Sequence, residues 1–364
     1  MNSIEDLKDM MLPHIRRLKP YHGVDPMEVI AERAGIPADQ VIRLNGNENP
    51  YGPSPRVNEA LGNFKFYNHY TDPEQRKLRS VLSKYLGAPE ERIVAGNGSD
   101  ELIDLLLRMF LGPGENIIIP SPTFGMYSFT ADICGGEAIS VASDENFELD
   151  VEAMVVAMTD KTKAVFLASP NNPSGNIASS SQIRALLETG RLIVVDETYY
   201  EFSGSTLCPL LDEYENLVIL RSFSKWAGIA GLRVGYAIAS SELIGHLMDI
   251  KQPYNINIAG EAAVLAALEH RGELLERAAT LIEQRKRLEA VVDKFPGISY
   301  YPSEANFLLC RFERRTAEEA YVELAQRGIF VRRFPQAVLD SSLRISTGTP
   351  EQTDLLIDAL RRVV

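Results

Sequence analysis

Short apolar runs alternate with longer amphipathic segments through the middle of the chain. The apolar runs predict buried strands, which we place at residues 117–119, 137–141, 163–167, 192–195, 217–220 and 233–239. Between several of them, residues 102–110, 181–189 and 242–251 carry apolar side chains at helical spacing. Strands that alternate with helices predict an α/β fold in which helices cover both faces of a mainly parallel sheet.

This alternation stops at residue 258. A long helical run follows at residues 258–292, and the charged pattern of residues 273–294 predicts an amphipathic connector. Further strands at residues 298–301, 307–311, 329–331 and 342–346, with helices at 317–327 and 351–362, predict a smaller α+β domain. The 364 residues suit two domains. We expect an N-terminal arm with part of the small domain at 1–45, a large domain at 46–257, and a connector helix with the C-terminal small domain at 258–364.

Lys225 follows one of the predicted strands and lies among small hydroxyl residues, in the run Arg221-Ser-Phe-Ser-Lys-Trp-Ala-Gly-Ile-Ala-Gly-Leu-Arg233. Lysine amines form Schiff bases, and enzymes that use pyridoxal phosphate (PLP) need one such lysine. Ser222 and Ser224 can donate hydrogen bonds to a phosphate, and Arg233 can neutralise it. A solvated basic loop is the alternative for a lone lysine, but three upstream motifs fit the same cofactor.

Asp196 ends another predicted strand, in Leu-Ile-Val-Val-Asp-Glu-Thr-Tyr199. Ligands of open α/β sheets bind beyond the carboxyl ends of the strands. A carboxylate there can keep a pyridine nitrogen protonated, which PLP chemistry requires, and Tyr199 can hydrogen-bond the phenolic oxygen of the ring. Considered alone, such an acid can equally bind magnesium or cap a helix.

Two turn motifs complete the set. Asn172 lies in Ser-Pro-Asn-Asn-Pro-Ser-Gly after a strand, where its amide can donate to the same phenolic oxygen; the turn can also be a simple connection. Gly-Asn-Gly98-Ser99-Asp100-Glu opens a helix, whose free N–H groups and positive end attract phosphate. A lone Gly-x-Gly is weak evidence for a phosphate site, since the turn can be a simple helix cap, with Asp100 as the capping residue.

In that order, these motifs resemble the fold type I PLP-dependent aminotransferases, and more narrowly the histidinol-phosphate aminotransferase family. The narrower resemblance adds segments that begin at Lys19, Leu44, Tyr70, Pro122, Pro253, Ala305 and Leu343. It implies a large domain built on a mainly parallel sheet and a smaller α+β domain. It also implies transfer of the amino group between L-histidinol phosphate and 2-oxoglutarate, giving imidazole acetol phosphate and glutamate, in histidine biosynthesis.

The resemblance implies a role for each matching residue. Lys225 would form the Schiff base and shuttle the proton, and Asp196 would pair with the pyridinium nitrogen. The other expected cofactor contacts are Asn172 and Tyr199 at the phenolic oxygen, Phe124 stacked on the ring, and Ser99, the Asp100 backbone, Ser222, Ser224 and Arg233 at the phosphate. Tyr70 would reach the phosphate in the neighbouring subunit, which makes a homodimer a requirement. Thr71 replaces a proline usual in the family, which should loosen that turn.

Four further residues match positions on the substrate side of the family's site. Arg344 resembles the arginine that grips a substrate carboxylate, and Arg332 a second, phosphate-binding arginine. The alternative for Arg332 is an exposed basic pair with Arg333. Tyr21 resembles a substrate-side tyrosine, although its arm can also simply pack on the core. Asn47, in Leu-Asn-Gly-Asn-Glu-Asn-Pro, is the fourth expected substrate contact.

Composition narrows the function further. A net charge of −13 disfavours nucleic acid as a partner. No apolar stretch approaches the roughly 20 residues of a membrane span, so we expect no membrane contact. Three widely spaced cysteines fit reduced thiols, and neither they nor the histidines show metal-binding spacing, so we expect no metal. The polar, acidic residues 1–7 predict no signal peptide, and hence a cytoplasmic enzyme.

Three alternatives share some of these motifs. The nearest is an aminotransferase of aromatic amino acids, since a site for flat side chains would suit them. The second is a PLP-dependent lyase that decarboxylates L-threonine phosphate. The third is a regulatory domain that binds PLP without turnover, although such proteins carry a DNA-binding module in front, and about 40 residues before Asn45 are too few for one.

Overall fold

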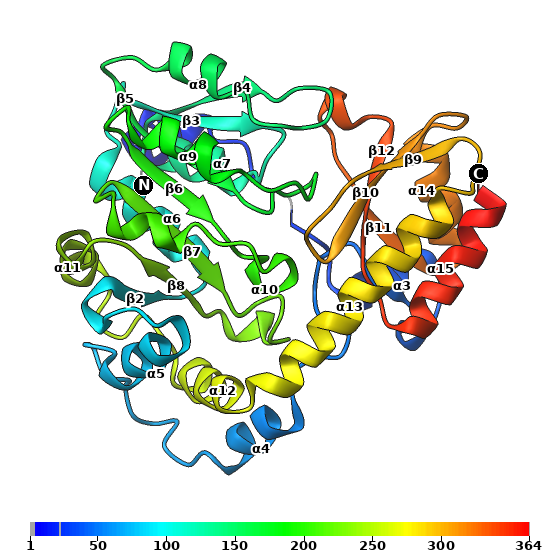
Figure 1. Cartoon of the computed structure of the whole chain (residues 1–364), viewed down its shortest axis with the longest axis horizontal. Coiled ribbons are helices and arrows are strands. Elements are labelled where there is room, and N and C mark those ends of the chain that lie inside the picture. The colour runs from blue at the N-terminus through cyan, green and yellow to red at the C-terminus, as the bar shows by residue number, and fades with distance from the viewer. Residues whose placement is uncertain (1–3, 22, 364) are drawn as a thin grey trace.

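The computed structural model describes residues 4–21 and 23–363, and in them the chain forms two β-sheets side by side (Figure 1). Residues 1–3 and Val364 lie outside the described residues. The first three belong to the polar N-terminal segment in which no signal peptide is expected, and Val364 belongs to the predicted small domain.

The large sheet has its strands in the order β2-β8-β7-β6-β5-β3-β4. Their bounds are β2 Ile93–Gly96, β3 Asn116–Ser121, β4 Glu137–Ala142, β5 Thr162–Ala168, β6 Leu192–Asp196, β7 Leu217–Ser222 and β8 Gly235–Ile238. Only β8 runs antiparallel to its neighbours. All the predicted strands of this domain are present, with β8 shorter than predicted, and β2 was not predicted.

Helices cover both faces of this sheet, as its unbroken apolar strands require. Along β6, Leu192 and Val194 face one core cluster, while Ile193 and Val195 face the other. The first cluster includes α6 (Ser99–Phe110), α7 (Met126–Ile133) and α11 (Ser241–Ile250). The second includes α4 (Pro55–Asn63), α5 (Arg76–Leu86), α8 (Val151–Ala157), α9 (Ser180–Leu187), α10 (Tyr200–Ser203) and α12 (Ile258–Glu269). Each fully buried branched side chain contributes about 1.5–3 kcal/mol to this packing.

The helical segment predicted at residues 258–292 consists of two helices instead of one, because the chain leaves the helical conformation at His270. Helix α12 ends and α13 (Arg271–Val292) begins at His270, whose φ of −109° and ψ of 28° leave the helical region. Gly272, a weak helix former, follows at once. The two helices have different tasks: α12 packs on α4 and α5, while α13 continues to the small sheet (Figure 1).

The small sheet has the order β1-β11-β12-β10-β9. Its strands are β1 Ile42–Leu44, β9 Ile298–Tyr301, β10 Phe307–Phe312, β11 Ile329–Arg333 and β12 Ser342–Ser346. Its apolar core also contains α13, α14 (Ala317–Gln326) and α15 (Pro350–Val363). The N-terminal segment contributes β1, which pairs in parallel with β11. The domain boundaries at residues 45 and 257 stay predictions.

The rest of the N-terminal segment joins both halves of the molecule. Helix α3 (Met27–Ala34) forms a small cluster with Phe330 of β11, whereas α2 (Pro13–Arg17), which follows α1 (Ile4–Met10), contacts α7 on the large sheet. The chain between α2 and α3 therefore crosses from one sheet to the other. Short 3₁₀ turns complete the fold: η1 Ala38–Gln40, η2 Glu90–Arg92, η3 Cys208–Asp212, η4 Ala230–Leu232 and η5 Ala337–Leu339.

Candidate active site

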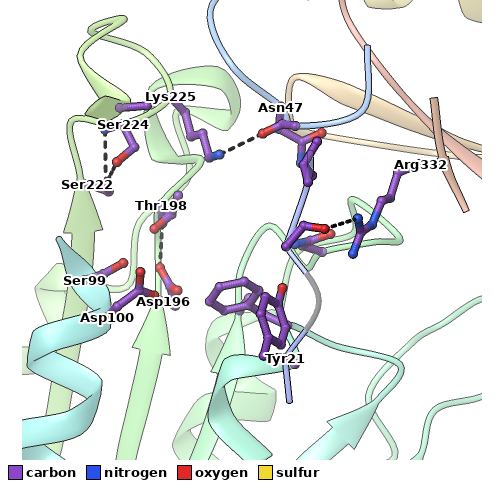
Figure 2. A pocket seen from close by; sticks show the side chains of 18 of the residues that line it. Tyr21, Asn47, Ser99, Asp100, Asp196, Thr198, Ser222, Ser224, Lys225 and Arg332 are labelled. Carbon is purple, nitrogen blue, oxygen red and sulfur yellow. Dashed lines mark hydrogen bonds between the residues drawn. The ribbon is translucent and has the colours of Figure 1, made fainter. Parts of the chain in front are cut away.

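A cavity of about 670 Å³ lies between the carboxyl ends of β5, β6 and β7 and the small sheet. The arrowheads of β6 and β7 point towards the small sheet in Figure 1, and Figure 2 shows the side chains that converge there. Predicted site residues that line the cavity are Tyr21, Asn47, Ser99, Asp100, Phe124, Asn172, Asp196, Tyr199, Ser222, Ser224, Lys225, Arg233, Arg332 and Arg344. Tyr70 does not line the cavity of its own chain.

Lys225 reaches into the cavity from the loop after β7 (Figure 2). Its Nζ donates a hydrogen bond to the backbone carbonyl of Gly46 at 3.0 Å. Burial, and then the positive charge of Arg344, lower the pKa of Lys225 to about 8. A lysine in this state holds an appreciable neutral fraction near pH 7, which is the nucleophilic form of the amine.

Asp196 is buried at the end of β6. One carboxylate oxygen accepts the Thr198 N–H at 3.0 Å, and the other accepts the Tyr127 hydroxyl at 3.1 Å. Burial raises the pKa of Asp196, and these two hydrogen bonds oppose that rise. Among the residues that the structure describes, no cationic side chain is paired with Asp196. A protonated ring nitrogen in the cavity would supply a positive charge next to this buried carboxylate.

Asn47 fixes the hydroxyl of Tyr199. Its amide donates to Tyr199 Oη at 2.9 Å, and its carbonyl oxygen accepts the Ser346 hydroxyl at 2.8 Å. The Asn47 N–H donates to the same serine oxygen at 2.9 Å, with Asn47 in the left-handed region at φ 53°. Tyr199 is nearly fully buried, so this network sets the direction of its hydroxyl lone pairs and proton.

A set of phosphate-type donors gathers at the start of α6. Ser222 donates to the Ser224 hydroxyl at 2.9 Å, and Arg233 pairs with the Asp100 carboxylate at 2.7 Å. Ser99 begins the helix just after Gly98, whose φ is 79°. Added at Gly98, a Cβ would lie 2.5 Å from Arg233 Nη2. Backbone N–H groups, hydroxyls and a guanidinium form a donor set that fits a phosphate.

On the opposite wall, Arg344 projects from β12. It is buried, donates to the Asn172 side-chain oxygen and to the Asn45 carbonyl, and leaves its Nε without a partner. Burial lowers its pKa to about 10. Arg332 donates to the Gly23 carbonyl at 3.2 Å, next to the N-terminal segment (Figure 2). Arg344 lines the cavity, so an anion bound there would offset the cost of burying its charge.

Three aromatic residues complete the comparison with the sequence. Phe124 lines the cavity and meets Tyr127 edge to face. Tyr21 also lines the cavity, and the centre of its ring lies 6.0 Å from that of Phe129 on α7. Its arm therefore packs on the large domain and faces the cavity at the same time. Tyr70 is 80% exposed and stacks on Tyr254. In the adjoining turn Thr71 donates to the Ile256 carbonyl at 2.9 Å, a bond that the family's usual proline cannot make.

Several residues that line the cavity are not predicted from the sequence. Thr198 lies within a motif quoted above and Tyr127 within the segment that begins at Pro122, but the sequence gives neither a role, and the Gly46 carbonyl leaves no trace in a sequence. The cavity also takes in Glu48 from the N-terminal segment. Over residues 4–21 and 23–363, no group of three or more His, Cys, Asp or Glu side chains is placed to hold a metal ion, and no helix is long and apolar enough to cross a membrane.

Residues 39–360 match the family of class I and II aminotransferases, and the chain belongs to that family. A histidinol-phosphate aminotransferase of Roseiflexus castenholzii is 45% identical and covers 97% of this chain and 98% of its own. A chloroplastic histidinol-phosphate aminotransferase of Arabidopsis thaliana is 42% identical, over 96% of this chain and 85% of its own. The histidinol-phosphate aminotransferase of Sinorhizobium meliloti, solved in complex with pyridoxal-5'-phosphate, superposes with a TM-score of 0.86 at 27% identity, over 97% of both chains. Within the class, the chain groups with the histidinol-phosphate aminotransferases.

These findings confirm the predicted family and fold. The fold is that of a type I PLP-dependent aminotransferase, with a mainly parallel large sheet and a second, mixed sheet. The structure brings the motif residues together but carries no ligand, so their individual roles stay predictions.

Proposed function

We propose that this chain is a PLP-dependent transaminase that moves an amino group between L-histidinol phosphate and 2-oxoglutarate, in histidine biosynthesis. The observation that carries the proposal is the meeting, in one cavity, of Lys225 with its lowered pKa, buried Asp196 and the phosphate-type donors at α6. The relatives named histidinol-phosphate aminotransferase, which match over most of their length, support the same reaction.

PLP would be held at both ends. Ser99, the α6 N–H groups, Ser222, Ser224 and Arg233 would bind its phosphate, and Asp196 its ring nitrogen. Asn172 and Tyr199 would meet its phenolic oxygen, while Phe124 would stack on the ring. When bound, PLP supplies the electron sink that weakens bonds to the substrate's α-carbon. The hydrogen-bonded Tyr199 hydroxyl and the buried Asp196 carboxylate are fixed beforehand, so binding costs little reorganisation.

Lys225 Nζ is the group that would move the proton. With a pKa of about 8, it can accept a proton from the substrate's α-carbon and give it back near neutral pH. Arg344 would orient the carboxylate of glutamate or 2-oxoglutarate through its guanidinium fork. With Arg332, it would bind the phosphate of histidinol phosphate in the other half-reaction. Tyr21 and the segment around Gly23 would cover the bound substrate and exclude water.

A homodimer with shared active sites is part of the proposal. Tyr70 lies outside the cavity of its own chain, and its neighbours Phe66, Tyr67 and Tyr254 are also exposed. Aromatic side chains clustered on a surface are typical of protein interfaces. Tyr70 would extend from this surface to the PLP phosphate of the second subunit. We also propose that the enzyme works in the cytoplasm.

The test is the cofactor spectrum of the purified protein while L-histidinol phosphate, L-phenylalanine and L-threonine phosphate are added separately. We expect only histidinol phosphate to convert the PLP band to that of the amino form, and 2-oxoglutarate to restore it. Equal conversion by phenylalanine would make the enzyme an aromatic aminotransferase. Carbon dioxide released from threonine phosphate would make it a lyase, and a protein without any PLP band would refute the proposal.

A further inference from the structure

Two charged residues of the cofactor motifs have no role so far: Glu197, next to Asp196, and Arg221, next to Ser222. They form a buried ion pair, with the residues 1% and 3% exposed. Arg221 Nε and Nη2 lie 3.0 and 2.8 Å from the same Glu197 oxygen. An ion pair removed from water in this way costs desolvation energy, and a hydrophobic pair of the same shape is often as stable. Its presence at the site therefore calls for a reason other than stability.

The pair lies on the opposite face of the sheet from Asp196 and Ser222, the residues that would hold the cofactor. Successive side chains of a strand point to opposite faces. Asp196 continues the face of Leu192 and Val194, towards α6 and α7, so Glu197 turns to the face of Ile193 and Val195. On β7, Ser222 and Arg221 divide between the two faces in the same way, because Val218 and Leu220 belong to one cluster and Leu217 and Ile219 to the other.

Because β6 and β7 are neighbours, the pair ties their carboxyl ends together. The last residues in register are Asp196 and Leu220, and the Glu197 N–H donates to the Leu220 carbonyl at 2.7 Å. The ion pair adds a side-chain bond just beyond this last backbone bond. It acts at the point where the backbone ladder between β6 and β7 ends.

The pair has further hydrogen-bond partners in the segment after β6. The Glu197 carboxylate accepts the Leu207 N–H at 2.7 Å and the Thr206 hydroxyl at 2.8 Å. Arg221 Nη2 also donates to the Thr206 oxygen at 2.7 Å, and its guanidinium lies 3.6 Å from the centre of the Tyr200 ring. Because each of these hydrogen bonds ties the pair to a fixed part of the chain, the network favours one geometry of the pair.

We propose that Glu197 and Arg221 are positioning residues for PLP, which set the separation between the Asp196 carboxylate and the Ser222 hydroxyl. The inference rests on the proposed function, in which Asp196 holds the ring nitrogen and Ser222 the phosphate. PLP is a rigid ring whose two ends must be met at once. The ion pair fixes both strand ends from the far face and so prepares the site before the cofactor arrives.

The test compares the wild type with a double variant, Glu197→Gln with Arg221→Met, both freed of PLP. This change removes both charges, keeps similar volumes, and leaves glutamine able to accept from Leu207 N–H. Two quantities are measured: the unfolding temperature of the cofactor-free protein, and the Kd for PLP from quenching of Trp226 fluorescence. Trp226 is the chain's one tryptophan and is next to Lys225.

Thr162→Val is the matched control. Thr162 and Asn116 form a buried hydrogen bond of 2.7 Å between the first residues of β5 and β3, at the opposite end of the same sheet. This variant should lower the unfolding temperature and leave the Kd for PLP unchanged. The control thereby separates general loss of stability from loss of positioning.

For the double variant we expect an unfolding temperature near that of the wild type and a Kd for PLP weakened roughly tenfold, by analogy with the loss of residues that orient metal ligands. We also expect the pH midpoint of the bound cofactor's absorbance to shift. A wild-type Kd would overturn the proposal.

If the double variant does not fold, the same two measurements, unfolding temperature and Kd for PLP, are made on Arg221→Lys. It keeps the charge and loses the two-nitrogen contact with Glu197. A weakened Kd at an unchanged unfolding temperature supports positioning, and a wild-type Kd overturns it. A wild-type protein that does not bind PLP at all would instead refute the proposed function.

Discussion

The amine of Lys225 should titrate near pH 8 in the protein freed of PLP. Its pKa is lowered from 10.5 to about 8, first by burial and second by the charge of Arg344. At pH 7 this leaves about one amine in ten neutral, against roughly one in 3,000 for an unshifted lysine. The structure therefore predicts a gain of about 300-fold in the reactive form of Lys225 near neutral pH.

The assay is the rate at which the cofactor-free protein captures PLP covalently, measured from pH 6 to 11 in short pulses that end in borohydride reduction, with mass spectrometry to locate the label. The rate should rise through a midpoint at about pH 8 and then level off. Lys225→Arg gives the background from other amines. In Arg344→Gln the midpoint should move upward, because a neighbouring positive charge that opposes protonation is gone, while burial keeps it below 10.5.

A wild-type midpoint above about 10 would refute this reasoning, since it would mean that water solvates the Lys225 ammonium as in an exposed side chain. A wild-type midpoint near 8 that does not move in Arg344→Gln would remove Arg344 from the causes and leave burial, together with the charges of Glu48, Arg233 and Asp100.

Three further changes have expected results. Lys225→Ala should abolish transamination while the fold remains, checked by turnover and circular dichroism; wild-type turnover would contradict the assignment. Tyr199→Phe should lower the free energy of unfolding by about 1–3 kcal/mol, because the buried Asn47 amide loses its acceptor; an unchanged denaturant midpoint would show that another group replaces it. Gly98→Ala should weaken PLP binding, because the new Cβ meets Arg233 at 2.5 Å and φ is 79°, and an unchanged Kd would contradict that clash.

The sequence predicts which side chains meet in the cavity because the ends of strands position most of them. Asp196 and Ser222 end β6 and β7, and Lys225 follows shortly after β7. Since parallel strands bring their carboxyl ends to one edge of the sheet, apolar runs that end in polar residues are enough to predict their meeting. The same reasoning predicts the alternation of strands and helices, whose bounds differ from the prediction by a few residues.

What the sequence could not supply depends on backbone atoms and on chain segments far apart. The partner of Lys225 is the carbonyl of Gly46, and any residue type has a carbonyl. The pairing of β1 with β11 joins the two ends of the chain, and short apolar segments at either end do not indicate their partner. The break at His270 coincides with a change of packing, since α12 and α13 cover different surfaces, and the single weak helix former Gly272 is not enough to predict it because helices tolerate an isolated glycine.

The pairing of Glu197 with Arg221 shows how a short motif can serve two faces of a sheet. Asp196 and Glu197 are neighbouring acids of similar chemistry, yet one lines the cavity and the other forms an ion pair on the far side. Their surroundings differ. In the described part of the chain Asp196 accepts hydrogen bonds from the neutral groups of Tyr127 and Thr198, whereas Glu197 is paired with the positive charge of Arg221. An exchange of their side chains would leave composition unchanged and disturb both faces, because one methylene would shift each carboxylate from its partners.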